Sequence, residues 1–147
     1  DKGGRAVREA LGQCGISPRK LVLDNGAGLS RIERISADAL NQLRRAAYRS
    51  PLFAEFESSL PIAATDGTLK HRFKGSSLAG NGHLKSGTLR DVSALAGYVD
   101  AADGRRVSVV MLVNHPRANR SEPAQRALLE WVQAAMDPDS GDRHDAR

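Results

Sequence analysis

Three consecutive stretches with strand character, at about 83–89, 92–100 and 106–114, constrain the fold of this chain more than any other feature. The last two are joined by Ala101-Ala102-Asp103-Gly104, in which Asp-Gly is a strong hairpin signal. Short connections join antiparallel neighbours, so the pattern predicts a three-stranded antiparallel meander. Residues 107–113 are apolar at almost every position, which predicts a central strand covered on both faces.

Helical patterns precede the meander. Residues 4–14 predict a helix stopped by Gly15, with apolar side chains on a buried face: Val7, Ala10, Leu11 and Cys14. A second helix is expected to begin after the N-cap Ser36 and to end near Tyr48, with Asp38 favourable to the dipole in its first turn. Its expected buried side chains are Leu40, Leu43 and Ala47. A short helix starting at Ser50-Pro51 follows, with an inner stripe of Leu52, Phe53 and Phe56.

A closing helix follows the meander. Ser121 is its expected cap, and its expected buried face consists of Ala124, Leu128, Trp131, Val132 and Ala135. Helices, then a meander, then a covering helix define an α+β fold in which helices cover an antiparallel sheet. We expect residues 1–136 to form one domain and the polar residues 137–147 to be a disordered tail.

Composition excludes several classes of protein. With 40% apolar and 27% charged residues among 147, the chain is globular rather than disordered. The net charge of +5 comes from scattered basic residues with only six aromatic residues, so a nucleic-acid partner is the third and weakest hypothesis and is not expected. No run of about 18 apolar residues is present to span a membrane. Asp1 is preceded by no initiator Met, so we expect a processed chain or a piece of a longer one.

Metal and thiol chemistry find little support. The single Cys14 forms no internal disulfide and is expected to be a buried structural thiol. The four histidines have no metal-ligand spacing, so no metal and no cofactor are expected. His83 is expected to face solvent on its strand, and Asp66 to cap the turn that follows it.

Lys85-Ser86-Gly87, on the first predicted strand, carries the clearest chemical pattern. It has the K-[ST]-G form found in penicillin-recognising serine hydrolases. Alternation along the strand places Lys85 and Gly87 on one side and the Ser86 hydroxyl on the other. Gly87 leaves room for an extended acyl-peptide beside the strand, and an ammonium with a hydroxyl suits a substrate carboxylate.

Longer stretches together resemble one family. They are LVLDNGAGLSR (21–31), SLPIAATDGTL (59–69), KSGTL (85–89), VSALAGY (92–98) and VNHP (113–116). In this order they resemble the penicillin-binding D-alanyl-D-alanine carboxypeptidases/endopeptidases of the low-molecular-mass class C group, over most of residues 5–135. Ala27 and Ala64 depart from the family's usual Ser and Gly.

The resemblance implies a fold, a reaction and a site. The fold would be the C-terminal part of a β-lactamase/transpeptidase-like domain, and the reaction serine acyl-transfer hydrolysis of peptidoglycan stem peptides in the periplasm, with β-lactams as inhibitors. By resemblance Lys85 is catalytic, in the polar network around the nucleophile, and Ser86, Gly87 and Thr88 bind substrate. Ser86 would hold the terminal carboxylate, and the Thr88 N–H would contribute to the oxyanion hole.

The family's other two motifs are not convincingly present. Ser17-Pro18-Arg19-Lys20 matches S-x-x-K as a string, but it follows a predicted helix stop, whereas the nucleophile needs a helix start. No S-x-N string occurs. We therefore expect a fragment of a serine D-Ala-D-Ala carboxypeptidase/endopeptidase that lacks the nucleophile and is inactive alone. The alternative is a truncated, catalytically inactive module that binds peptidoglycan peptides. An exposed sheet edge would favour a homo-oligomer.

Overall fold

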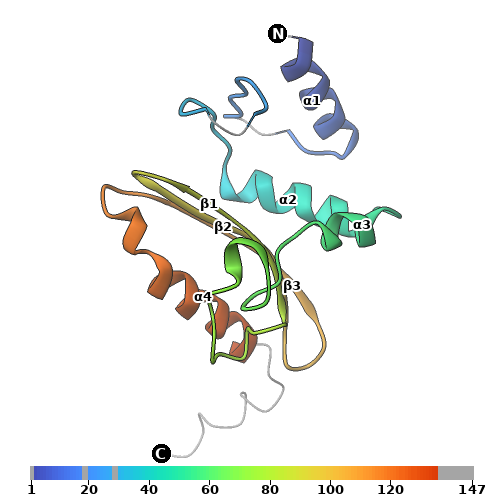
Figure 1. Cartoon of the computed structure of the whole chain (residues 1–147). Helices are drawn as coiled ribbons and strands as arrows, with labels where there is room; N and C mark the ends of the chain where they lie inside the picture. The colour runs from blue at the N-terminus through green and yellow to red at the C-terminus, as the bar shows by residue number, and fades with distance from the viewer. Residues whose placement is uncertain (1, 18–19, 28–29, 136–147) are drawn as a thin grey trace, which may run out of the picture. The chain divides into compact units, whose positions relative to one another are not determined.

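The computed structural model describes residues 2–17, 20–27 and 30–135 (Figure 1). Its chain divides into two compact units, Asp1–Phe53 and Ala54–Arg147. That residues 1–136 form a single domain stays a prediction. The predicted tail, 137–147, lies outside the described residues. Among the described residues, no helix is both long enough and apolar enough to cross a membrane.

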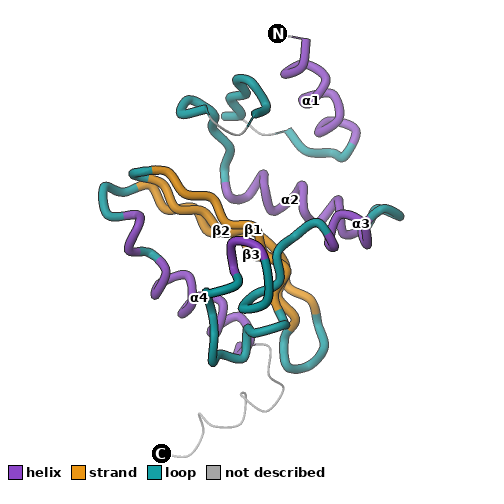
Figure 2. The backbone as a smooth tube through the Cα atoms, viewed as in Figure 1, coloured by secondary structure: helices purple, strands orange, loops and turns teal. Residues whose placement is uncertain are grey.

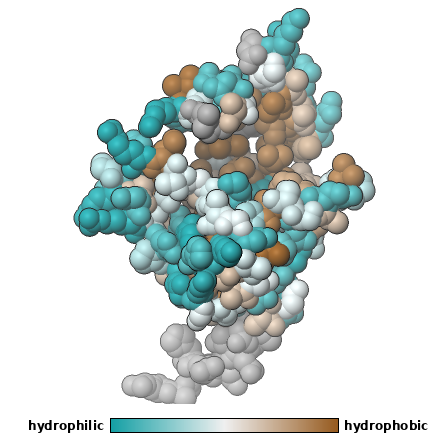
Figure 3. Space-filling view, in the orientation of Figure 1, coloured by the Kyte–Doolittle hydropathy of each residue, from teal (hydrophilic) through white to brown (hydrophobic). Residues whose placement is uncertain are grey.

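The first unit contains helices α1 (Lys2–Gln13) and α2 (Ala37–Tyr48). The predicted cap of α2 is confirmed, because the Ser36 hydroxyl accepts a hydrogen bond from the Ala39 N–H at 3.1 Å. A small core holds the unit together, consisting of Leu11, Ile16 and Leu21 with the half-buried Leu23, Ile35, Leu43 and Ala46. Hydrophobic side chains also reach the surface of this unit (Figure 3), where Ile32 is 59% exposed.

The predicted buried face of α1 is largely wrong. Leu11 is the one buried residue of α1. Val7 is 45% exposed, and Ala10 and Cys14 are also exposed. The periodicity identified the helix, but a core this small covers only one position of its apolar stripe. In α2 the side chains of Leu40, Leu43 and Ala47 are half-buried rather than buried.

The second unit contains the predicted meander. Strands β1 (Gly82–Leu89), β2 (Val92–Asp100) and β3 (Arg106–Asn114) form an antiparallel sheet in the order β1-β2-β3 (Figure 2). The expectation that β3 is central is wrong, because β2 lies between its two hairpin partners and β3 is an edge strand of the described sheet. Apart from Val109, the apolar side chains of β3 are only half-buried.

Helix α4 (Glu122–Ala135) covers one face of this sheet (Figure 1). The core between them includes Leu84, Leu95 and Val99 from the sheet and Leu129 and Val132 from α4. Its remaining buried members come from β3 and from the segment before β1: Ala63, Leu69, Phe73, Leu78 and Val109.

Trp131 is not the core anchor that its size predicted. It is 66% exposed, and Ala124 is exposed as well. The buried positions of α4 are Gln125, Leu129, Val132 and Gln133, which follow helical spacing and place Trp131 on the opposite side.

The other face of the sheet is approached by the short helix α3 (Phe53–Ser58). The Phe56 ring packs edge-on against Tyr98 of β2 at a centroid distance of 6.4 Å. The predicted inner stripe of this helix is largely wrong: Leu52 is 65% and Phe56 38% exposed, and α3 has no fully buried residue.

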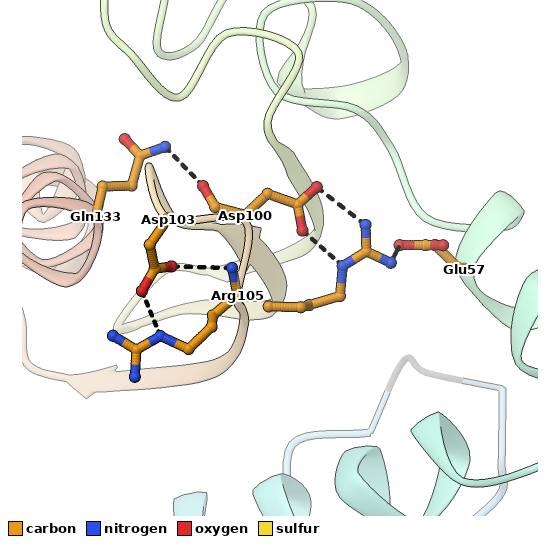
Figure 4. A network of polar contacts seen from close by, with 6 residues as sticks. Glu57, Asp100, Asp103, Arg105 and Gln133 are labelled. Atoms are coloured by element: carbon orange, nitrogen blue, oxygen red, sulfur yellow. Dashed lines mark hydrogen bonds and ion pairs between the residues drawn. The ribbon is translucent and has the colours of Figure 1, made fainter. Parts of the chain in front are cut away.

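An ion-pair network fastens α3 to the far end of the sheet (Figure 4). Arg106 donates to both carboxylate oxygens of Asp100, at 2.6 and 2.9 Å, and also to Glu57 of α3. The hydrogen bonds that Arg106 donates to Asp100, with the negative charges of Asp100 and Glu57, raise the pKa of Arg106 above its usual value. Gln133 of α4 donates to the Asp100 carbonyl at 3.1 Å, so this corner connects α3, the sheet and α4.

Candidate functional site

The site begins with the outer edge of β1. At its start the Leu84 N–H donates to the Pro61 carbonyl and the Gly82 carbonyl accepts from the Ala63 N–H, each at 2.8 Å. In an antiparallel strand the outward-facing backbone groups recur at every second residue. The N–H and C=O groups of Ser86 and Thr88 therefore point to the same edge, and no described strand pairs with them there.

Lys85 lies on the side of β1 away from α4. It is exposed, and its Nζ donates to the Ser86 carbonyl at 2.7 Å, so the ammonium lies at the open edge. Gly87, opposite Ala94 of β2, has no fold-imposed need to be glycine, since an added Cβ would make only an ordinary contact, at 3.6 Å, with the Ala94 Cβ. The absence of a side chain there leaves the strand open beside Lys85.

The Ser86 hydroxyl lies on the side of β1 that faces α4. It is hydrogen bonded to the Thr68 hydroxyl at 2.8 Å. Thr68 belongs to the single-turn 3-10 helix Gly67–Leu69, which carries the Gly-Thr-Leu of the second family-like stretch. The structure therefore brings together two of the stretches that the sequence linked only by resemblance.

Ser86 and Thr68 line a polar pocket of about 310 Å³. Its described lining is rich in hydroxyls and amides and includes Thr88, Ser93, Asn119, Ser121 and Gln125, with the ion pair of Arg72 and Glu122. Lys85 and Gly87 are not among these residues, as the alternation along β1 requires. The pocket offers donors to a small polar group that reaches Ser86.

A part-buried network of polar contacts lies beside this pocket and includes three of its lining residues, Arg72, Ser93 and Gln125. Arg72 donates to Gln125, which is 1% exposed and in turn donates to the Ser93 hydroxyl at 3.0 Å. Arg72 also lies 3.6 Å from the Glu122 carboxylate. Because Arg72 follows Thr68 by four residues, its attachment to α4 holds the Thr68 turn against β1.

Sequence reasoning missed Thr68, Arg72 and Gln125. Thr68 stood within a stretch quoted for its resemblance, but nothing local indicated that its hydroxyl would meet Ser86, 18 residues later. Gln125 was hidden because a buried glutamine at a helical spacing is indistinguishable in sequence from a solvent-facing one.

Two further expectations need correction. Asp66 does not cap the turn that follows it; its carboxylate accepts from the Ile62 N–H at 2.6 Å and so closes the preceding turn. His83 is half-buried rather than solvent-facing, because Ile62 bridges to it at the strand edge. Its Nδ1 is buried and has no hydrogen-bond partner in the described part of the chain.

Ser17 and Lys20 show no nucleophile geometry. Helix α1 ends at Gln13, and both residues are exposed outside helices. Pro18 and Arg19, between them, lie outside the described residues. Ala64, where the family usually has Gly, adopts the left-handed conformation with φ of 61°.

The fold and the sequence of this chain both have counterparts among known proteins. The fold of the chain matches that of penicillin-binding protein 4 from Haemophilus influenzae, with a TM-score of 0.81 and 25% identity. The match covers 89% of this chain and 31% of that one. The same protein in complex with a β-lactam matches with a TM-score of 0.73 and 26% identity, over 87% of this chain and 33% of that one. Residues 1–135 match the D-Ala-D-Ala carboxypeptidase 3 (S13) family, and the chain belongs to it.

Similar sequences are named as carboxypeptidases. A D-alanyl-D-alanine carboxypeptidase of Actinomadura sp. (strain R39) is 38% identical over 137 residues, which are 90% of this chain and 24% of the relative. Carboxypeptidase DacB of Mycolicibacterium smegmatis is 29% identical over 89% of this chain and 29% of its own length. The chain therefore spans about a quarter of the length of these relatives.

Proposed function

We propose that this chain is the part of a serine D-Ala-D-Ala carboxypeptidase/endopeptidase that binds the substrate's carboxylate and oxyanion, and that it lacks the nucleophile. The observation that carries the proposal is the Ser86 hydroxyl, held by Thr68 in a polar pocket directly beside an open strand edge. Family membership supports the reaction class. The substrates are peptidoglycan stem peptides, and the site of action is the periplasm.

Each role follows from a position on β1. A stem peptide would extend along the open edge, pairing with the outward backbone groups of Ser86 and Thr88, while Gly87 leaves it room. The Ser86 hydroxyl would donate to the terminal carboxylate. The Thr88 N–H, pointing outward, would stabilise the oxyanion of the tetrahedral intermediate. Lys85, whose ammonium reaches the same edge, would join the network around a nucleophile supplied from outside this chain.

The missing nucleophile leads to a sharp expectation for β-lactams. Oxyanion donors alone form no ester, so this chain should give no covalent adduct with benzylpenicillin. Intact-mass spectrometry after incubation with penicillin measures this directly. An adduct mapped to Ser17 would contradict the proposal, because it would show that Ser17 is a nucleophile and that residues 17–20 form a working S-x-x-K motif.

A second candidate is a catalytically inactive module that binds peptidoglycan peptides. Its support is that S-x-N is missing while the Ser86 pocket is intact. The two candidates share the binding step and differ in whether the rest of a hydrolase accompanies it. Sequencing the source gene in frame upstream of the Asp1 codon separates them, since S-x-x-K at a helix start together with S-x-N supports the hydrolase. A stop codon there supports the module, in which pairing of the open edge with a second copy would cover it.

A further inference from the structure

We propose that Gln125 of α4 is a positioning residue of the Ser86 pocket, through which the helix sets the hydroxyl groups that receive the substrate carboxylate. The inference rests on the proposed function and adds a residue that no sequence motif indicated. Gln125 lines the pocket, although it is only 1% exposed. A polar side chain buried this deeply costs stability unless its hydrogen bonds are made, so the partners of Gln125 show what it holds in place.

The two ends of the Gln125 amide face different partners. A guanidinium group can only donate, so Arg72, which donates to Gln125, fixes the amide oxygen on its own side. The amide nitrogen lies on the other side and donates to the Ser93 hydroxyl at 3.0 Å. Arg72 belongs to the segment before β1, and Ser93 belongs to β2. One buried side chain of α4 therefore joins two separate parts of the site.

The contact with Arg72 reaches Ser86 through Thr68. The Thr68 hydroxyl is hydrogen bonded to the Ser86 hydroxyl at 2.8 Å. Arg72 follows Thr68 by four residues, and its N–H donates to the Leu69 carbonyl at 2.9 Å, so a tight turn connects the two side chains. A displacement of the Arg72 side chain is therefore passed to Thr68 and from there to the hydroxyl of Ser86.

The contact with Ser93 orients a hydroxyl beside Thr88. Ser93 pairs with Thr88 across strands β1 and β2, and both residues line the pocket. Side chains of directly opposed residues lie on the same face of a sheet. Because the Ser93 oxygen accepts from Gln125, the Ser93 O–H can donate to a carboxylate in the pocket. Gln125 thus orients a second hydroxyl donor next to the one on Ser86.

Gln133 provides a matched comparison on the same helix. It is 7% exposed, its amide oxygen accepts from the Ser77 hydroxyl at 2.6 Å, and its amide nitrogen donates to the Asp100 carbonyl at 3.1 Å. It lines a different pocket and is absent from the described lining of the Ser86 pocket. Gln125→Met and Gln133→Met each replace a buried amide by an unbranched apolar side chain, so both should lower stability while only the first alters the site.

The test compares amide NMR spectra of the isotope-labelled whole chain, alone and titrated with a peptide ending in D-Ala-D-Ala or its C-terminal amide. In the ligand-free chain, Gln125→Met should shift the signals of Ser86 and Thr88, and Gln133→Met should leave them in place. Gln125→Met should lower affinity for the acid about fivefold, the size of one lost hydrogen bond, with affinity for the amide unchanged. Combined with Thr68→Val, it should lose less than the product of the two single losses, because both act on Ser86.

Failure of this inference differs from failure of the proposed function. If the unaltered chain binds acid and amide equally, the proposed function fails, and the ligand-free spectra decide the inference: unshifted Ser86 and Thr88 signals in Gln125→Met overturn it. If the unaltered chain prefers the acid and Gln125→Met keeps that preference, the inference is overturned. Equal losses in Gln125→Met and Gln133→Met would overturn it too, because lower stability of α4 would then explain both.

Urea denaturation shows whether both methionine variants are folded under the conditions of the titration. Gln125→Asn is a milder second variant, because it keeps a buried amide but is one methylene too short to reach both partners. It should show the same changes at Ser86 and Thr88 to a smaller extent. A folded Gln125→Asn variant with an unchanged spectrum and an unchanged preference for the acid would overturn the inference.

Discussion

At the scale of single residues, the site depends on which way one hydroxyl group donates. The Ser86 hydroxyl can donate a hydrogen bond to a substrate carboxylate only if it does not donate to Thr68. The Thr68 hydroxyl, 2.8 Å away, meets this condition when it donates its own hydrogen bond to the Ser86 oxygen. Thr68 is thus a positioning residue in this account, because it acts through Ser86.

Replacing Thr68 by Val removes the hydroxyl and keeps the shape. We expect affinity for a peptide ending in D-Ala-D-Ala to fall about fivefold, which corresponds to about 1 kcal/mol for one lost hydrogen bond. Thr68→Ser retains the hydroxyl and is the matched control. Calorimetric titration of both variants measures the difference, and equal affinities would show that Thr68 does not orient Ser86.

Ala64 provides a second test at this scale. Its φ of 61° lies in the left-handed region, which costs a residue with a Cβ roughly 1–2 kcal/mol. Ala64→Gly relieves this cost but adds flexibility to the unfolded chain, so we expect a net stabilisation of about 0.5–1 kcal/mol. Urea denaturation measures it. A destabilised variant would mean that the Ala64 side chain makes contacts worth more than the backbone cost.

At the scale of elements, the position of β1 against β2 sets the geometry of the site. Gly97 faces Leu84 across the strand pair, and a Cβ at Gly97 would lie 2.1 Å from the His83 carbonyl oxygen and 2.5 Å from the Leu84 Cα. Since these are backbone atoms, β1 itself would have to move.

Gly97→Ala should therefore destabilise the chain by about 1–3 kcal/mol, the usual cost of overpacking. Gly87→Ala, also on this strand pair, should leave stability within about 0.5 kcal/mol because its Cβ has room, as for ordinary surface substitutions. Thermal denaturation of the two variants tests the contrast. If Gly87→Ala proved as damaging as Gly97→Ala, the fold and not the substrate would explain the glycine of K-S-G.

The elements themselves were predictable where local signals were strong. The three strands were found within a residue, because runs of strand-forming residues and the Asp-Gly hairpin signal are local properties of the chain. The order of strands in the sheet and the burial of single faces were not. Val107 to Val113 look the same in sequence whether a strand lies at the centre or at an edge. Trp131 and Cys14 were misplaced because spacing defines a stripe without saying which part of it a neighbour covers.

At the scale of the whole molecule, the two ends of the described sheet carry different tasks. One end presents K-S-G and its polar pocket, and the opposite end is held by Arg106 with Asp100 and Glu57 (Figure 4). Of the first end, the K-S-G residues were recognisable from the motif, whereas the pocket residues on other elements were not. The ion pairs of the opposite end were not recognisable either, since Glu57 and Arg106 are 49 residues apart.

Arg106→Gln should destabilise the second unit by about 1–2 kcal/mol, because it leaves two partly buried carboxylates without their shared partner. This expected loss of stability is kept small because both carboxylates are partly exposed to solvent. Arg105→Gln is the matched control, since the side chain of Arg105 is 62% exposed and its pair with Asp103 should contribute no measurable stability. Chemical denaturation compares them. A similar effect from both variants would assign the loss to net charge.

The central claim is that Ser86 and its pocket recognise a terminal carboxylate, and one titration tests it most directly. A peptide ending in D-Ala-D-Ala and the same peptide with a C-terminal amide are each added to the isotope-labelled chain. The account predicts saturable amide shifts centred on Ser86, Gly87 and Thr88 with the acid, clearly weaker binding of the amide, and loss of the acid's binding in Ser86→Ala. Equal binding of acid and amide, or shifts that leave β1 unaffected, would contradict it.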